Sequence, residues 1–388
     1  MGPSPGSAHS DRRHPGTGAS RFDRLRPGDR VAVLSPSFAA PAIFPQVHEQ
    51  ALQRIRDDLG LTPVEFATTR RHASSPADRA ADITAAFADP EIRAVFATIG
   101  GEDQVTVVPL VDDAVLRHNP KPFFGYSDNT HLLNHLHRLG VGGFYGGSTQ
   151  VQIGSGPGID DVHLRSLRAA LFGEGPGVGV SADQRLGAGD GVSDGGTVGR
   201  AVEIELTDPG EAEDFGVDWA SARALTEFGE RRPTRPWEWV GPAADVAGPT
   251  WGGCLESLVE IGMAGRYPRP EDLRGAILMV ETSEEVPPVS WVRRWMRALG
   301  ERGILAEVAG VIASCPPTST LAETPDEATR RGYADDQAHA IIATVAEYNA
   351  EVPVCVGIPF GHTRPQWIVP YGGTVRLDGV NRRVFARY

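Results

Sequence analysis

Residues 121–150 read KPFFGYSDNTHLLNHLHRLGVGGFYGGSTQ, and the rest of the chain is organised around them. The apolar run at 122–124 predicts a buried strand, and leucines on one face predict a helix over 128–139. Ser127 lies at the junction, where a sharp turn would lift its hydroxyl above the sheet, toward the free N–H groups of the helix. This arrangement suits a nucleophile. Ser127 or Asp128 could also serve simply as a helix N-cap, because both residue types are favoured there.

The composition is that of a folded protein with enough sequence for two domains. The chain has 388 residues, of which 40% are hydrophobic and 22% are charged. A net charge of -13, with no run rich in Lys or Arg, argues against nucleic acid or an anionic membrane as a partner. No stretch approaches the roughly 20 apolar residues of a membrane span, and the N-terminus lacks the apolar core of a signal peptide. We therefore expect small molecules or proteins as partners.

Only three cysteines are present, and they are widely spaced, at Cys254, Cys315 and Cys355. They build neither a disulfide framework nor a CxxC metal site. This suits a reducing cytosol, so a cytoplasmic location is expected. Residues 1–22 are rich in Gly, Pro, Ser and His and are predicted to form a flexible tail.

Strands and helices alternate over residues 23–172. Strands are predicted at Val31–Ser35, near Val64, at Arg93–Gly101 and at Gly143–Tyr145, and helices around Phe44–Leu59, Ala77–Ala88 and Ile159–Leu171. Alternation of this kind predicts a parallel sheet with crossover helices. We assign these residues to an N-terminal domain that carries Ser127.

Two glycines, Gly100 and Gly101, end the third of these strands. Ligands of parallel sheets gather at such strand ends, and the missing side chains would let backbone amides approach a substrate near Ser127. The alternative is an ordinary tight turn before a helix that carries Val107, Val108 and Leu110.

Residues 173–249 are predicted to be a connector that includes an active-site loop. The segment is dense in glycine and aspartate and contains an insertion near 178–200. Trp219 stands out in this polar context. Its ring could cover a small hydrophobic cluster or stack on a planar ligand.

Residues 250–388 are predicted to form a second α/β domain. Its strands include Ala276–Val280, Val308–Ala313 and Val352–Val356, with helices at Trp291–Arg302 and Asp335–Asn349 and short strands near Ile368, Val375 and Val384. Glu281 follows the first of these strands, and His362 lies in a Pro/Gly-rich loop after the third. Each could be structural, as a solvated strand end or a hydrogen-bond donor. Together with Ser127 they supply a nucleophile, a base and an orienting carboxylate.

Six motifs in register resemble the LD-carboxypeptidase family of serine peptidases, and within it the microcin C self-immunity peptidases. They are Thr98–Gly101, Gly125–Asp128 with Thr130, Phe144–Gly146, Gly252–Gly253 with Leu255, Ile277–Glu281, and His362–Thr363 before Gly372. The matches run from about Gly28 to the C-terminus.

The resemblance implies a Rossmann-like N-terminal domain, a C-terminal domain with a small β-barrel-like sheet, and an active site in the cleft between them. Ser127 would be the nucleophile, His362 the general base and Glu281 its orienting partner. The oxyanion hole would be formed by the N–H groups of Gly101 and Asp128. By the same resemblance, Trp219 would stack on a nucleotide base.

Two positions depart from the immunity-type pattern. Cys254 stands where an asparagine can follow the Gly-Gly pair, and acidic Glu284 and Glu285 stand where a basic residue can follow the glutamate. A basic group would pair with an acidic substrate side chain, whereas a carboxylate should repel it. Glu256 could line the same pocket as Glu285, or it could be a solvated carboxylate in the first turn of a helix.

We therefore expect a cytoplasmic serine peptidase, acting as a homodimer on a peptide or an aminoacyl-nucleotide. No metal or other cofactor is expected. The alternative enzyme is an LD-carboxypeptidase that trims muropeptides in cell-wall recycling. A small-molecule binding protein on a degenerate peptidase scaffold is the non-enzymatic alternative, and the presence of all three triad residue types argues against it.

Overall fold

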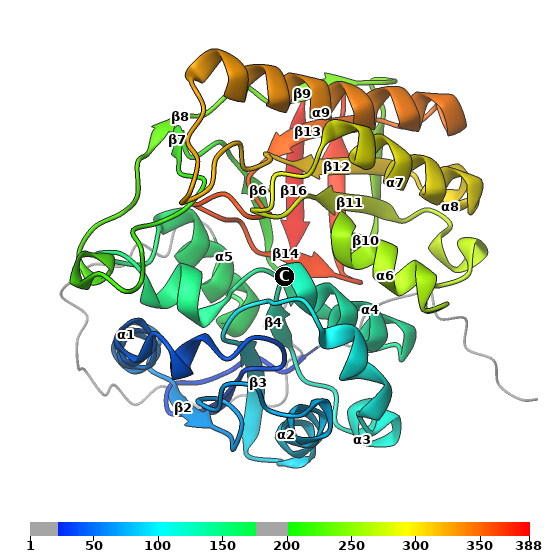
Figure 1. Cartoon of the computed structure of the whole chain (residues 1–388). Coiled ribbons are helices and arrows are strands. Elements are labelled where there is room, and N and C mark those ends of the chain that lie inside the picture. Colours follow the sequence, from blue (N-terminus) through cyan, green and yellow to red (C-terminus); the bar gives the residue numbers. More distant parts are fainter. Residues whose placement is uncertain (1–21, 176–200) are drawn as a thin grey trace, which may run out of the picture.

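The structure is a computed structural model that describes residues 22–175 and 201–388. The predicted tail, apart from Phe22, and the insertion near 178–200 lie outside these residues. Within them the chain forms two large sheets with helices packed around both, and the N-terminal half lies below the C-terminal half in Figure 1. This confirms a mixed α/β fold with a parallel-sheet N-terminal domain and a second sheet domain.

The first sheet has the strand order β14-β5-β4-β3-β1-β2. Its parallel strands are β1 (Arg30–Leu34), β2 (Thr62–Glu65), β3 (Ile92–Ala97), β4 (Phe123–Gly125) and β5 (Gly143–Tyr145). The helices of this half are α1 (Pro45–Asp57), α2 (Pro76–Ala88), α3 (Asp113–His118), α4 (Thr130–Arg138) and α5 (Asp161–Phe172). All of β4 and nearly all of β1 and β3 are buried, as expected for a parallel sheet covered on both faces.

The sixth strand of this sheet comes from the far end of the chain. Strand β14 (Val369–Tyr371) pairs antiparallel with β5, so Val369 lies opposite Tyr145. The C-terminal half is thus hydrogen-bonded into the N-terminal sheet, directly beside the strands that lead to the candidate site.

The second sheet has the order β6-β16-β15-β10-β11-β12-β13-β9. Its parallel centre consists of β10 (Asp245–Cys254), β11 (Ile277–Glu281), β12 (Gly310–Ser314) and β13 (Val354–Ile358). Antiparallel strands extend both edges: β15 (Thr374–Asp378), β16 (Arg383–Arg387) and β6 (Glu203–Leu206) on one side, and β9 (Glu238–Val240) on the other. The helices are α6 (Leu255–Met263), α7 (Val289–Glu301), α8 (Ile304–Glu307) and α9 (Glu327–Tyr348).

The expectation of a small β-barrel-like sheet is wrong. The short C-terminal strands do not close on themselves. Strand β14 joins the first sheet, whereas β15 and β16 extend the second sheet. β16 pairs with β6, which lies in the predicted connector. The described strands therefore form an open second sheet.

Two predicted helices also differ in detail. The segment with Val107, Val108 and Leu110 forms two 3-10 turns, at Gln104–Thr106 and Val108–Leu110, since Pro109 interrupts a longer helix. The helix after Ser127 starts with a 3-10 turn at Ser127–Asn129 before α4 begins. In the part of the chain that the structure describes, no helix has the length and apolar character needed to cross a membrane.

Candidate active site

Ser127 follows β4 on a strained turn. Its φ is +60°, in the left-handed region that non-glycine residues rarely adopt, and such strain costs about 1–3 kcal/mol. The neighbouring β3 loop approaches so closely that a Cβ on Gly100 would lie 2.9 Å from the Ser127 hydroxyl oxygen. Asn129 ties the two loops together, because its side-chain amide donates to the Ile99 carbonyl at 3.0 Å. The local sequence thus holds the hydroxyl of the half-buried Ser127 in a fixed position.

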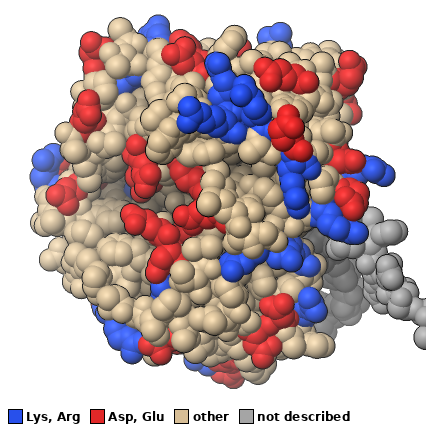
Figure 2. All heavy atoms as spheres, turned by 45° about the vertical axis from the view of Figure 1, so that its right-hand side comes forward, with Lys and Arg blue, Asp and Glu red and all other residues tan. Residues whose placement is uncertain are grey.

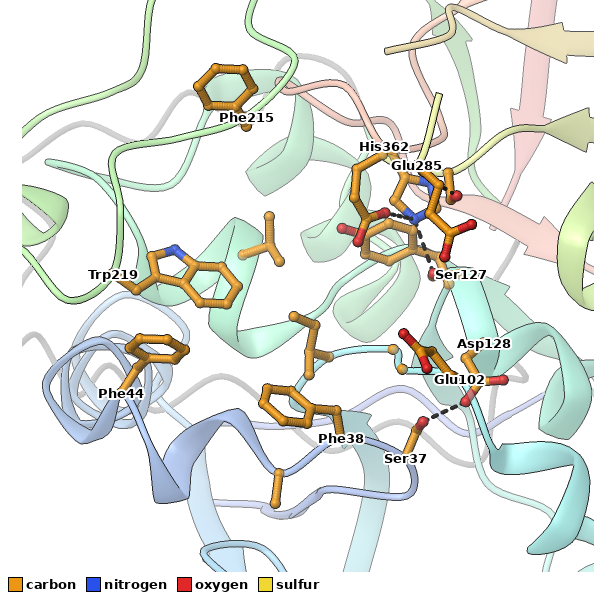
Figure 3. A pocket seen from close by; sticks show the side chains of 18 of the residues that line it. Ser37, Phe38, Phe44, Glu102, Ser127, Asp128, Phe215, Trp219, Glu285 and His362 are labelled. Carbon is orange, nitrogen blue, oxygen red and sulfur yellow. Dashed lines mark hydrogen bonds and ion pairs between the residues drawn. The ribbon is translucent and has the colours of Figure 1, made fainter. Parts of the chain in front are cut away.

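The structure brings Ser127, His362 and Glu281 together from both halves of the molecule. Nε2 of His362 lies 2.9 Å from Oγ of Ser127, and Nδ1 lies 2.6 Å from Oε2 of Glu281. Figure 3 shows the contact between Ser127 and His362. The Glu281 side chain is fully buried and that of His362 is 6% exposed, so the hydrogen bonds are shielded from water. Such a chain of contacts can move a proton from the hydroxyl to the imidazole.

Tyr145 and Gly361 complete the surroundings of Glu281. The buried Tyr145 hydroxyl donates to Oε1 of Glu281 at 2.5 Å and accepts a hydrogen bond from the N–H of Ser127 at 3.2 Å. A Cβ on Gly361 would lie 2.6 Å from Oε2 of Glu281, so only glycine allows the His362 loop to pass this closely. Burial raises the pKa of Glu281, while His362 and Tyr145 act in the opposite direction.

A second carboxylate contacts the same imidazole. Oε2 of Glu284 lies 3.0 Å from Nε2 of His362, on the nitrogen that also faces Ser127. Burial alone would lower the pKa of His362, but the charges of Glu281 and Glu284 outweigh it and raise this pKa well above its usual value. The positive form of His362 is therefore favoured while Glu284 stays in contact.

Gly101 and Asp128 both line the cavity beside Ser127. A Cβ on Gly100 would come within 3.2 Å of the Asp128 nitrogen, which places the β3 loop against the start of the helix. The Asp128 carboxylate accepts hydrogen bonds from the Ser37 hydroxyl and, at 2.9 Å, from the Gln104 N–H. Within residues 22–175 and 201–388, no acceptor is recorded for the N–H of Gly101.

A cavity of about 970 Å³ opens beside Ser127. The remaining predicted residues Gly100, Trp219, Glu256 and Glu285 all line it. Trp219 meets Phe44 edge to face at a ring distance of 5.6 Å, and Figure 3 shows both rings across the pocket from Ser127 and His362. The cavity is therefore long enough to separate an aromatic end from a reactive end.

Models of two protein-family domains match the chain. The LD-carboxypeptidase N-terminal domain matches residues 31–146, and the LD-carboxypeptidase C-terminal domain matches residues 247–377. The chain belongs to the LD-carboxypeptidase family. It is accordingly a hydrolase of the serine carboxypeptidase type.

Relatives within the LD-carboxypeptidase family span most of the chain. A Vibrio cholerae protein named "Putative carboxypeptidase" is 25% identical over 90% of this chain and 93% of its own length. The microcin self-immunity protein MccF of Escherichia coli is 23% identical over 79% of this chain and 77% of its own length. The structure of MccF in complex with aspartyl sulfamoyl adenosine matches with a TM-score of 0.75 at 20% identity, covering 95% of this chain and 98% of the other. This likeness supports the shared fold.

Sequence reasoning gave no role to Tyr145, and it considered Glu284 only as a charge that should repel an acidic substrate side chain. Tyr145 belongs to one of the family motifs and ends β5 at the edge where Ser127 lies, so its position at a strand end was an available signal. Glu284 belongs to an acidic loop that resembles an ordinary solvated turn in the sequence. Its contact with His362 is seen only in the folded structure.

Within the described residues, one group of side chains has donor atoms close enough to hold a metal. Donor atoms of Asp128, His131 and Glu260 lie within 4.8 Å of one another. Nε2 of His131 is 3.2 Å from Glu260 and 3.6 Å from Asp128, so His131 already contacts both carboxylates. Burial lowers the pKa of His131 to about 4, which keeps its ring neutral.

Proposed function

We propose that this LD-carboxypeptidase family member cleaves the amide of an aminoacyl-nucleotide with a Ser127–His362–Glu281 triad. The observation that carries the proposal is the chain of contacts from Ser127 Oγ to His362 (2.9 Å) and from His362 to Glu281 (2.6 Å) beside the cavity. As an extension of this proposal, the protein acts in the cytoplasm as a homodimer.

In the proposed reaction Ser127 Oγ attacks the carbonyl carbon of the substrate while Nε2 of His362 takes the hydroxyl proton. The N–H groups of Gly101 and Asp128 stabilise the oxyanion of the tetrahedral intermediate, each contributing on the order of 3 kcal/mol. The C–N bond breaks, and His362 returns the proton to the leaving nitrogen. Water then attacks the acyl-enzyme by the same route, releasing the acid and restoring Ser127.

Two features support a nucleotide as the leaving group. Trp219 presents a flat ring at the end of the cavity opposite Ser127, with Phe44 behind it. In addition, the MccF relative has been solved with aspartyl sulfamoyl adenosine and with glutamyl sulfamoyl guanosine. A base stacked on an aromatic side chain gains roughly 1–3 kcal/mol in nucleic-acid complexes, and we apply that scale here.

The test compares Trp219→Ala with the unmodified protein on two substrates, an aminoacyl-sulfamoyl adenosine and an LD-linked tetrapeptide. Loss of stacking should lower kcat/KM for the nucleotide by about ten- to a hundredfold, because about 1.4 kcal/mol corresponds to a factor of ten. The tetrapeptide has no base to stack and should be cleaved almost as before. Trp291→Ala is the matched control, since Trp291 is half exposed on α7, away from the cavity.

Muropeptide cleavage is the alternative function. A Bacillus subtilis relative named "Probable murein peptide carboxypeptidase" is 33% identical over 144 residues, 36% of this chain. Efficient tetrapeptide cleavage without any nucleotide activity would establish this alternative. Small and equal effects of Trp219→Ala on both substrates would remove Trp219 from the binding site.

A further inference from the structure

Carboxylates gather in the part of the cavity that faces Ser127. Glu102, Glu256, Glu284 and Glu285 all line it, and Figure 3 shows Glu285 and Glu102 on opposite sides of Ser127. In Figure 2 a hollow in the surface is bordered by Asp and Glu side chains. A substrate that reaches Ser127 must therefore pass between negative charges.

The basic side chains of the cavity do not balance these carboxylates. Three arginines line it, and each pairs with an aspartate: Arg71 with Asp78 at 2.5 Å, Arg79 with Asp103 at 2.7 Å and Arg364 with Asp160 at 2.6 Å. His362 is held between Glu281 and Glu284. Among the described residues, Glu102, Glu256 and Glu285 have no basic partner within ion-pair distance.

Hydrogen bonds hold the carboxylate of Glu256 and the backbone of Glu285 in place. The N–H and hydroxyl of Ser283 donate to Oε1 of Glu256 at 2.9 and 2.8 Å, and the same hydroxyl accepts from the N–H of Glu285 at 3.2 Å. Burial raises the pKa of Glu285, and the nearby charges of Glu256, Glu284 and Glu102 raise it further. The carboxylates repel one another, so a positively charged ligand group placed among them would relieve the repulsion.

We propose that Glu285 and Glu256, with Glu102 facing them, select substrates whose acyl residue carries a cationic side chain. This inference rests on the proposed function, because it assumes that the carbonyl attacked by Ser127 belongs to an aminoacyl group. The α-ammonium of such a group satisfies one carboxylate. The remaining carboxylates match a second positive charge, such as a lysyl ammonium, and disfavour a carboxylate.

The test uses three sulfamoyl adenosines that carry lysyl, norleucyl or glutamyl groups, and three LD-linked tetrapeptides with the same residues before the cleaved bond. Norleucine matches the alkyl chain of lysine without its charge. In the series that the enzyme cleaves, kcat/KM should be about tenfold higher for lysyl than for norleucyl and lowest for glutamyl. The lysyl preference should shrink with added salt, since the site opens to solvent.

Two variants of Glu285 test whether this carboxylate causes the preference for a lysyl group. Glu285→Gln should reduce the lysyl-to-norleucyl ratio about fivefold, and Glu285→Lys should favour glutamyl over lysyl. Glu347→Gln makes the same charge change at an exposed position on α9 outside the cavity, and the ratio should not move.

The outcomes separate the two proposals. Nucleotide cleavage with glutamyl equal to or faster than lysyl would overturn the cationic preference and leave the proposed function intact. A lysyl preference seen only in the tetrapeptides would support the cationic preference and reject the nucleotide substrate. Cleavage of neither series would overturn both.

Discussion

Replacing Glu284 by glutamine should move the acid limb of the pH–rate profile to lower pH. Glu284 lies 3.0 Å from Nε2 of His362, the nitrogen that must accept the Ser127 proton. The charges of Glu281 and Glu284 overcome the effect of burial and raise the pKa of His362, and protonated imidazole cannot act as a base. Activity should therefore rise with pH through this pKa. Removing one of the two charges should lower the pKa and extend activity into acid.

The size of the shift follows from the exposure of the pair. Unit charges 4 Å apart interact by about 4 kcal/mol at an effective dielectric constant of about 20, whereas fully exposed pairs contribute about 0.2–1 kcal/mol. The Glu284 side chain is 65% exposed and that of His362 is 6% exposed, so the value should lie between these limits. We take about 1.4 kcal/mol, which corresponds to about one pH unit. On the acid limb, where the rate is proportional to unprotonated His362, the variant should then be about tenfold faster than wild type.

The assay is kcat/KM against pH for wild type and Glu284→Gln, on whichever substrate the wild type cleaves, with Glu347→Gln as the control for net charge. A second readout needs no substrate. The raised pKa of His362 stabilises the fold below the unfolded value near 6.5, and this stabilisation is lost as pH rises through the folded pKa. The variant should therefore lose stability mainly in acid. An acid limb that stays in place, or moves to higher pH, would refute the assignment of Glu284 as a control on His362.

Three further predictions concern the proposed machinery. Ser127→Ala should abolish hydrolysis and leave the thermal unfolding midpoint near its wild-type value, and His362→Ala should lower activity about as much. The double variant should be no slower than either single variant, because the losses of triad members are not additive. Near-normal turnover by Ser127→Ala would contradict the serine mechanism. Tyr145→Phe removes a hydrogen-bond donor from the buried Glu281 carboxylate, so it should lower the free energy of unfolding by about 1–3 kcal/mol and also lower kcat. Denaturant titration and kinetics measure these two effects. Unchanged stability would contradict the role of Tyr145 as a donor to Glu281. EDTA should leave activity unchanged, and loss that zinc restores would implicate the Asp128–His131–Glu260 group.

The sequence predicted most of the first sheet because a buried parallel strand has a simple signature. The runs in β1, β3 and β4 are apolar and bounded by polar residues or glycine, and their strand ends identified Ser127 and Gly100 as candidates. The same logic identified Glu281 at the end of β11 and His362 after β13. In an α/β fold, chemistry gathers at the carboxyl ends of strands, so order along the chain was enough to find the candidates.

Strand partners were harder to predict than strands. The segments near Ile368, Val375 and Val384 alternate like strands, but alternation says nothing about which edge a strand joins. In the structure β14 joins the first sheet, and β15 and β16 join the second sheet. The small β-barrel-like sheet expected for these strands therefore does not form. The pairing joins segments that lie far apart in the sequence, and no local pattern encodes it.

The crossing of β14 has a consequence for the site. His362 belongs to the C-terminal half, yet the residues that follow it form hydrogen bonds with the N-terminal half. The guanidinium of Arg364 donates to Asp160 at 2.6 Å and to the carbonyls of Val151 and Gly158 at 3.0 and 3.1 Å, and Val369 then pairs with Tyr145. These contacts fix His362 relative to the sheet that carries Ser127. The contact between Ser127 and His362 is therefore built into the fold, so it does not need a substrate to close the two halves.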